Sequence, residues 1–104
     1  PGIGVSLDSL TAHASQLGGI SIEAPEHMIG KNTTECMKSG LIYSSAAAMD
    51  GIIDRLQEQL GGEATVIATG GLAKKIVPHC RREIILDDDL LLKGLAIIYK
   101  KNRK

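Results

Sequence analysis

The chain has 104 residues, of which 43% are hydrophobic and 23% charged, and twelve Lys and Arg balance twelve Asp and Glu. This is the composition of one modest soluble domain, or of part of a larger one. Zero net charge and the lack of Phe and Trp argue against a nucleic-acid partner, and no apolar run approaches the roughly 20 residues that span a membrane.

The first segment opens with Pro1-Gly2 in place of an initiator Met, so we expect either a removed start or a piece of a longer protein. Helical spacing of leucines predicts a helix over Ser6–Leu17, with Ser6 as N-cap and Gly18-Gly19 as its end. A short extended piece follows, and a loop then leads to Gly30.

The dominant predicted element is a helix from about Thr33 to Leu60, capped by Asn32 or Thr33 and ended by Gly61-Gly62. We expect Glu35 to strengthen its start. Residues at near-fourfold steps predict one apolar stripe, formed by Met37, Leu41, Ala48, Ile52, Leu56 and Leu60. Small residues between Ser39 and Gly51 indicate a close helix–helix contact, either within the domain or across a dimer.

The stretch Glu63–Leu72 predicts a strand followed by a helix. Its β-branched run from Thr65 to Ile67 is typical of a strand buried on both faces of a parallel sheet. The strand stops at Thr69-Gly70-Gly71, and a helical pattern, Leu72–His79, begins at once and is ended or distorted by Pro78. The glycines either admit a ligand against bare backbone at the helix start, or form only a tight turn.

The last predicted elements are a second buried strand over Glu83–Leu86 and a helix over Leu90–Lys101. Asp87-Asp88-Asp89 lies between them. Three adjacent carboxylates are compatible with a metal site, but we favour the interpretation that they cap and charge the start of the last helix, and we assign no metal ligand.

The histidines and cysteines predict no catalytic site. His13, His27 and His79 lack partners at ligand or catalytic spacing, and adjacent His79 and Cys80 cannot act as base and nucleophile without an orienting carboxylate. Cys36 and Cys80 are too few and too far apart for a disulfide framework or a zinc site. We expect reduced thiols in a cytoplasmic protein.

Four segments carry a family resemblance in their order and spacing: Pro1-Gly2-Ile3-Gly4; Gly30-Lys31-Asn32-Thr33 with Met37 and Ser39-Gly40; Ala68-Thr69-Gly70-Gly71-Leu72; and Asp89-Leu90 with Lys93-Gly94-Leu95. On these residues, essentially the whole chain resembles the C-terminal half of a type III pantothenate kinase, the family also called the Bvg accessory factor family.

The resemblance implies an α/β fold, the C-terminal ribonuclease-H-like half of the acetate/sugar kinase–Hsc70–actin (ASKHA) fold, with one long helix and shorter helices on a small sheet. Residues 1–104 would be the C-terminal lobe of a two-lobed kinase. It also implies ATP-dependent phosphorylation of pantothenate to 4'-phosphopantothenate in coenzyme A biosynthesis, by a cytoplasmic homodimer using Mg²⁺ and a monovalent cation (K⁺ or NH₄⁺). By similarity, Thr33 and Asn32 would contact pantothenate, and Thr69, Gly70 and Gly71 the nucleotide.

The chain also departs from the family pattern. Phosphoryl transfer needs a phosphate cradle, a carboxylate that holds the metal and a base. The family supplies these from two Asp-containing phosphate loops and a Gly-x-Asp-Arg motif upstream of the matched region, and Asp54-Arg55 does not replace them because it falls mid-helix. We therefore assign no catalytic residue and expect an inactive chain without its N-terminal lobe. The alternatives are a non-catalytic regulatory module and a half-domain that mediates dimerisation.

Overall fold

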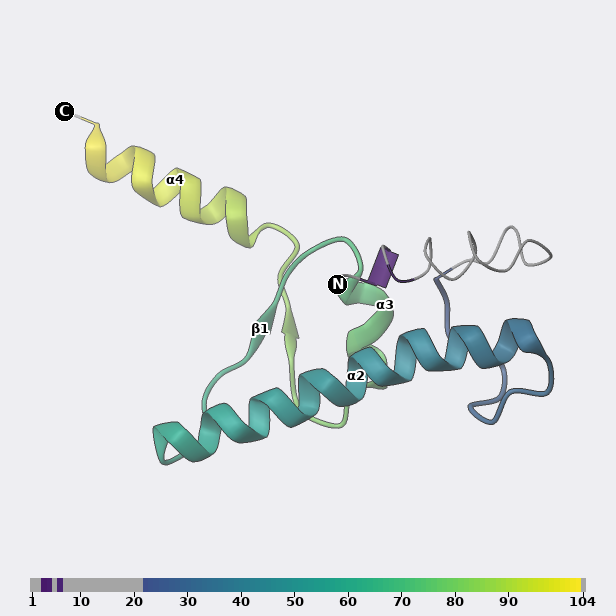
Figure 1. The fold of residues 1–104 in the computed structure, drawn as a ribbon. Helices are drawn as coiled ribbons and strands as arrows, with labels where there is room; N and C mark the ends of the chain where they lie inside the picture. The colour runs from purple at the N-terminus through teal and green to yellow at the C-terminus, as the bar shows by residue number, and fades with distance from the viewer. Residues whose placement is uncertain (1–2, 5, 7–21, 104) are drawn as a thin grey trace.

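The computed structural model describes residues 3, 4, 6 and 22–103, so the predicted helix over Ser6–Leu17, with His13, lies outside them except for Ser6. Figure 1 shows the elements, in chain order α2 (Thr33–Leu60), β1 (Ile67–Ala68), α3 (Ala73–Ile76), the 3-10 helix η1 (Val77–His79), β2 (Ile85–Leu86) and α4 (Leu90–Asn102). The radius of gyration is 17.3 Å, against about 13 Å for a compact chain of 100 residues. The molecule is therefore extended.

Helix α2 begins and ends where the sequence predicts. Asn32 is the N-cap, and its side-chain oxygen accepts a hydrogen bond from the Glu35 N–H at 2.9 Å. The Glu35 carboxylate in turn accepts from the Lys31 N–H at 3.2 Å. At the other end Gly61 takes a left-handed conformation (φ 79°), and its N–H donates to the Gln57 carbonyl at 3.0 Å. Side-chain and glycine caps thus fix both ends.

The core lies between the middle of α2 and the α3–η1 segment. Ile42, Ala46 and Ile76 are buried there together, with Leu72 and Cys80 half-buried against them. Along α2 the inward positions Ile42, Ala46, Met49 and Ile53 follow steps of four, three and four residues. This alternation keeps side chains on one face of a helix with 3.6 residues per turn.

The predicted apolar stripe along α2 was wrong. Of its members only Leu41 is buried, whereas Ile52, Leu56 and Leu60 are each more than half exposed. Successive steps of four residues rotate by about 40° each on a helix of 3.6 residues per turn, so the predicted stripe winds around α2 instead of facing one neighbour.

Strands β1 and β2 pair in parallel, with Ile67 opposite Ile85 and Ala68 opposite Leu86. The predicted parallel sheet is thus confirmed, and the segment between the strands, α3 with η1, forms a β–α–β connection. The predicted burial on both faces was wrong, because Ile67 and Ile85 are about half exposed. In the described part of the chain the main packing joins the helices to one another, and the strand residues stay partly uncovered.

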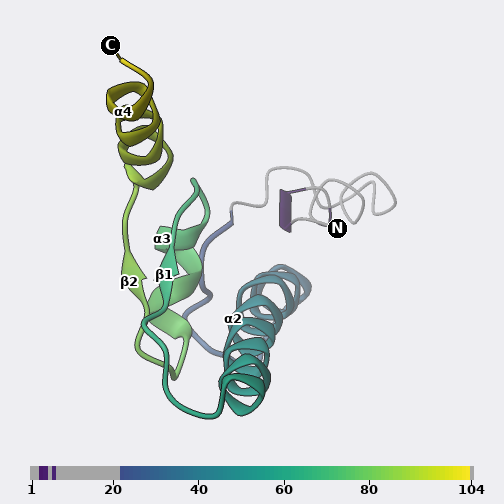
Figure 2. The same ribbon diagram turned by 90° about the vertical axis from the view of Figure 1, so that its left-hand side faces the viewer.

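The remaining helices also match the predicted positions. Helix α3 ends at Ile76, and η1, which contains Pro78, begins at the next residue. The α-helix stops here because a proline ring does not fit a continuing α-helix. Helix α4 covers the predicted range and one residue more. Both ribbon views show α4 leaving the sheet and pointing away from α2 (Figures 1 and 2). Among the described helices, none combines the length and apolar character needed to cross a bilayer.

Candidate functional site

The turn Thr69–Gly71 lies at the carboxyl end of β1, as the sequence predicts. Gly70 has φ +110°, a conformation that side-chain-bearing residues rarely adopt, and Thr69, Gly70 and Gly71 are exposed. A Cβ atom added at Gly70 or Gly71 would meet no atom within 4 Å. The backbone here is therefore open to a ligand. The helix that follows, α3, is a single α turn, so its dipole is small.

The acidic segment Asp87–Asp89 lies beside this turn, because the Asp87 N–H donates to the Ala68 carbonyl at 2.9 Å. The Asp87 carboxylate accepts from the Lys93 ammonium at 2.8 Å and from the Asp89 N–H at 3.0 Å. Hydrogen bonding to Lys93 lowers the pKa of Asp87 and raises the pKa of Lys93. Asp88 pairs with Lys74 at 2.9 Å. Local lysines and backbone N–H groups thus engage two of the three carboxylates.

The predicted capping role of these aspartates needs correction. Asp89 occupies the N-cap position of α4, but its side chain makes no capping hydrogen bond. Asp87 instead fixes the segment that leads into α4, because its carboxylate accepts hydrogen bonds from the Asp89 N–H and from the Lys93 ammonium. The reason is geometric, because Asp89 has φ −100° and ψ 11° rather than the extended conformation that directs an N-cap side chain back over the helix.

The Asn32–Thr33 segment forms the start of α2 and is held by a tightly folded loop. The Ser39 hydroxyl donates to the Met28 carbonyl at 2.6 Å. Gly30 packs so closely that an added Cβ would lie 2.6 Å from the backbone nitrogen of Cys36. The side-chain oxygen of Asn32 is already used as the N-cap acceptor, which leaves its NH₂ group for a substrate. Thr33 is exposed, and its hydroxyl makes no hydrogen bond to another described residue.

The structure does not bring the two predicted binding segments together. Helix α3, which follows the glycine turn, packs on α2 near Ile42 and Ala46. Ile42 lies nine residues beyond Thr33, which corresponds to about 14 Å along the helix axis. Any shared ligand site therefore needs further polypeptide to join the segments.

The sequence did not reveal how α2 holds the turn that leads into β2. Both oxygens of Asp50 accept backbone hydrogen bonds, from the Arg81 N–H at 2.8 Å and the Arg82 N–H at 3.0 Å. One helical turn later, Asp54 accepts a bidentate pair from the Arg82 guanidinium at 2.6 and 2.9 Å. The spacing of Asp50 and Asp54, with two adjacent arginines downstream, was the only sequence signal.

The ion pair between Asp54 and Arg82 sets the ionisation of both groups. Hydrogen bonding to the guanidinium lowers the pKa of Asp54, and the carboxylate raises the pKa of Arg82. Asp54 is thus a structural anion that stays charged at neutral pH.

The free thiols and His79 are placed in structural contacts. Burial raises the pKa of the Cys80 thiol, with a smaller contribution from Asp50, so Cys80 is a poor nucleophile. The ring of His79 packs edge-on against Tyr43, with centroids 5.3 Å apart. Cys36 and Cys80 are both free thiols, as predicted.

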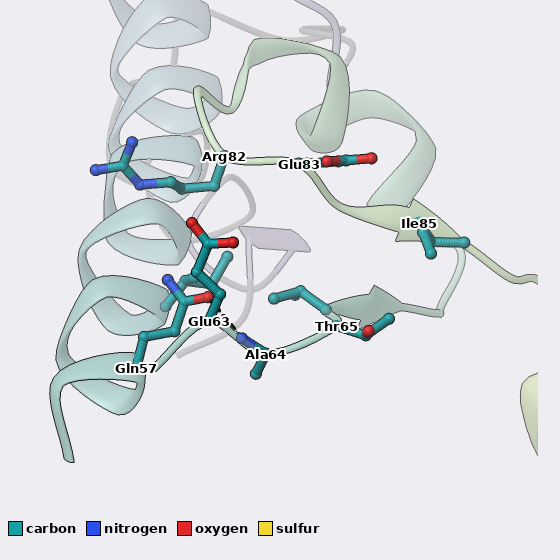
Figure 3. A pocket seen from close by; sticks show the side chains of 9 residues that line it. Gln57, Glu63, Ala64, Thr65, Arg82, Glu83 and Ile85 are labelled. Atoms are coloured by element: carbon teal, nitrogen blue, oxygen red, sulfur yellow. Dashed lines mark hydrogen bonds between the residues drawn. The ribbon is translucent and has the colours of Figure 1, made fainter. Parts of the chain in front are cut away.

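A hollow of about 490 Å³ lies between α2 and the starts of the two strands (Figure 3). Ile53, Val66 and Ile85 give it apolar walls, and its polar lining comes from Gln57, Glu63, Arg82 and Glu83. The Gln57 side-chain oxygen accepts from the Ala64 N–H at 3.0 Å across one side. Ligands of open parallel sheets bind beyond the carboxyl ends of strands, whereas this hollow adjoins the amino ends. We therefore keep the candidate site at Thr69–Gly71.

The fold defines an α/β protein built on a β–α–β unit, and comparisons with known proteins specify its family. The model of the type III pantothenate kinase family matches residues 1–55, and the chain belongs to this family. A type III pantothenate kinase of Acidothermus cellulolyticus is 43% identical over 102 residues, which are 98% of this chain and 40% of the relative. One from an Exiguobacterium strain is 44% identical over all 104 residues, 41% of its length.

Another type III pantothenate kinase, of Moorella thermoacetica, shows the same relation, with 43% identity over 98% of this chain and 40% of the relative. These matches confirm the resemblance that the sequence motifs indicated. The chain spans about 40% of the length of these curated relatives.

Proposed function

We propose that this chain is the C-terminal lobe of an ATP-dependent pantothenate kinase, which phosphorylates pantothenate to 4'-phosphopantothenate in coenzyme A biosynthesis. The observation that carries the proposal is the sequence match. Essentially the whole chain aligns with relatives named type III pantothenate kinase and covers about 40% of their length. The open glycine turn after β1 supports it, since such a turn suits a nucleotide.

The finer assignments belong to the same proposal. The lobe has the ribonuclease-H-like topology of the ASKHA fold, and the β–α–β unit is its described part. Thr69, Gly70 and Gly71 contact ATP through exposed backbone, while the Thr33 hydroxyl and the Asn32 NH₂ group contact pantothenate. The protein acts as a cytoplasmic homodimer, with no nucleic-acid or membrane partner.

A metal and a monovalent cation would have to be held elsewhere. Mg²⁺ prefers free carboxylates together with substrate phosphates. Here Asp87 and Asp88 are paired with lysines, and Asp50 and Asp54 are committed to the 81–82 turn. These residues do not fit a Mg²⁺ site, and the described residues include no group of three or more His, Cys, Asp or Glu side chains that could hold an ion. In this proposal the chain alone is inactive, because the family's phosphate loops and catalytic base belong to the N-terminal lobe.

The proposed homodimer is supported by the outer face of α2. Gly40, Ser44, Ala47 and Gly51 follow steps of four, three and four residues and are all exposed. They lie about 150° around the helix from the buried face at Ile42, Ala46 and Ile53. A Cβ atom at Gly40 or Gly51 would meet nothing within 4 Å. This face allows the close approach of another backbone, as the dimerisation-module alternative also requires.

A chimera tests the proposed function. The Exiguobacterium relative would receive this chain in place of its matched segment, and pantothenate-dependent ATP consumption would be measured. We expect activity within about tenfold of the parent relative, because the two segments are 44% identical without a large length difference. A folded chimera with parent-like melting behaviour and no activity would overturn the proposal.

Two variants of the chimera test the site residues. Thr33→Val removes one hydroxyl and is expected to raise KM for pantothenate by roughly 5- to 150-fold, the equivalent of about 1–3 kcal/mol for a lost buried hydrogen bond. Gly71→Val fills space beside the turn and is expected to raise KM for ATP. Gln59→Val, exposed near the end of α2 and outside the proposed dimer face, is a control for both substrate constants. Unchanged constants would remove Thr33 or Gly71 from the site.

A further inference from the structure

The loop that leads into α2 carries the two residues proposed to contact pantothenate, Asn32 and Thr33. It folds back beside the first turns of the helix (Figure 1). The Ser39 hydroxyl of α2 donates to the Met28 carbonyl at 2.6 Å, and Gly30 lies so close to the helix that a Cβ atom does not fit. The positions of the two substrate contacts therefore depend on how this loop is held against α2.

Glu35, in the first turn of α2, joins three parts of this loop. Its backbone N–H donates to the Asn32 side-chain oxygen at 2.9 Å, and its carboxylate oxygen Oε2 accepts from the Lys31 N–H at 3.2 Å. The same oxygen lies 3.6 Å from Nδ1 of His27, at the start of the loop. The side chain of Glu35 is 21% exposed and that of His27 is 40% exposed, so both are partly shielded from water. Glu35 thus links the imidazole to the residues beside Thr33.

The Nδ1 atom of His27 is buried and makes no hydrogen bond to another described residue. A distance of 3.6 Å to Glu35 is slightly longer than the roughly 2.7–3.2 Å of an N–H···O hydrogen bond. A carboxylate only accepts hydrogen bonds, so a lone pair on Nδ1 would repel Glu35, whereas a hydrogen on Nδ1 attracts it. A small approach of the two side chains completes the bond and satisfies a buried polar atom, which is unfavourable to leave unpaired.

We propose that His27 is a positioning residue for the pantothenate site. Donation from its Nδ1 to Glu35 fixes the carboxylate that accepts the Lys31 N–H, and this holds the loop that presents Asn32 and Thr33. Contacts of a binding site have to be held within about 0.5 Å of their productive geometry, so one anchoring bond affects affinity. His27 itself does not touch the substrate. The inference rests on the proposed function, since it requires pantothenate at Asn32 and Thr33.

Kinetics of the chimera described above separate positioning from other roles. His27→Ala removes the donor and is expected to raise KM for pantothenate about 5-fold or more, while kcat and KM for ATP stay within about twofold. His27→Asn keeps an N–H donor close to the place of Nδ1 and is expected to restore KM to within about twofold of the wild type. Glu26→Ala, exposed at the preceding position, is the control.

A double-mutant cycle shows whether His27 acts through Glu35. Glu35→Ala is expected to raise KM for pantothenate at least as much as His27→Ala does, because the Lys31 N–H also loses its acceptor. Adding His27→Ala to Glu35→Ala is expected to change KM by less than about twofold, since the shared bond is already lost.

The tautomer of His27 tests the contact itself, without any enzymatic activity. Heteronuclear NMR of the ring nitrogens in this chain, with the imidazole neutral, is expected to show the hydrogen on Nδ1. The Glu35→Ala variant is expected to lose this preference, because the acceptor beside Nδ1 is gone. A purely packing role of the ring would leave the tautomer unchanged.

Several results would overturn the inference. They are an unchanged KM in His27→Ala, no rescue by His27→Asn, additive effects in the cycle, and a hydrogen on Nε2 in the wild-type chain. A loss of kcat in His27→Ala with KM unchanged would also overturn it, since that result places His27 at the reacting groups. Failure of the proposed function looks different: the folded wild-type chimera is then inactive, whereas the tautomer is measured on the chain alone.

Discussion

Two regions of this molecule differ in how completely they are stabilised by their own residues. Around α2, both helix ends are capped, the inward face is buried against α3, and Asp50 and Asp54 satisfy the donors of the 81–82 turn. In the β1–β2–α4 region, two short strands are half exposed and a strongly apolar helix projects from them. The first region is a small folded unit, and the second leaves its apolar side chains exposed in the described chain.

The difference explains where burial contributes to stability. Fully burying a side chain of the size of Leu or Ile stabilises a fold by about 1.5–3 kcal/mol. Ile42 gains that contribution within the chain, being fully buried. The leucines and isoleucines of α4 gain little of it within the described chain, because they are exposed. The most apolar helix in the described chain therefore contributes least to the chain's own stability.

The sharpest test of the comparison uses two neighbouring faces of α2. Ile42→Ala opens a cavity in the core and is expected to destabilise the chain by about 2–5 kcal/mol, measured by urea unfolding. Ile52→Ala is the matched control, on the same helix and with 57% of the residue exposed. It is expected to cost less than about 1 kcal/mol. Equal losses would mean that the face carrying Ile52 is also packed.

A second test contrasts Gly30, in the loop before α2, with Gly40, inside α2. Gly30→Ala forces a Cβ to within 2.6 Å of the Cys36 backbone nitrogen and is expected to destabilise by about 1–3 kcal/mol. Gly40→Ala meets nothing and is expected to stabilise the helix by up to about 1 kcal/mol. Thermal unfolding of the two variants measures both effects. A neutral Gly30→Ala would show that the loop does not close on α2 as described.

A smaller effect concerns pH. The pKa of Asp54 is lowered from 3.8 in the folded state by Arg82, so its contribution is present above pH 3.8 and is lost as pH falls through the lower folded value. Stability is expected to decline on acidification in this range, and less steeply in Asp54→Asn. The effect is small because the pair is exposed to solvent. Glu58→Gln, one turn further along α2 and exposed, is the control and should leave the slope unchanged.

Local chemistry explains which parts of the fold the sequence could predict. Asn32, Gly61 and Pro78 act on their immediate neighbours, so the ends of α2 and α3 follow from residue type and position. The parallel sheet followed from the short apolar, β-branched run of the first strand, whereas its pairing with the second strand is seen in the structure. The family motifs identified the glycine turn and the Asn32–Thr33 loop as the candidate site residues.

Burial could not be predicted in the same way, because it depends on what lies opposite each residue. The steps of four that suggested a stripe from Met37 to Leu60 ignored the rotation of the helix. The strands carry the β-branched pattern of a fully covered sheet, yet Ile67 and Ile85 are half exposed in the described chain. Asp50 and Asp54 bond to residues about 30 positions away, and the spacing of charged residues along one sequence does not identify such long-range partners.

Reconstitution in trans tests the kinase assignment most directly. The purified chain, the separately expressed unmatched part of the Exiguobacterium relative and their mixture would be incubated with ATP and pantothenate, and 4'-phosphopantothenate would be quantified. We expect no product from either polypeptide alone and product from the mixture, which Thr33→Val in this chain should reduce at low pantothenate. Product from this chain alone, or no product from a mixture shown to form a complex, would contradict the assignment.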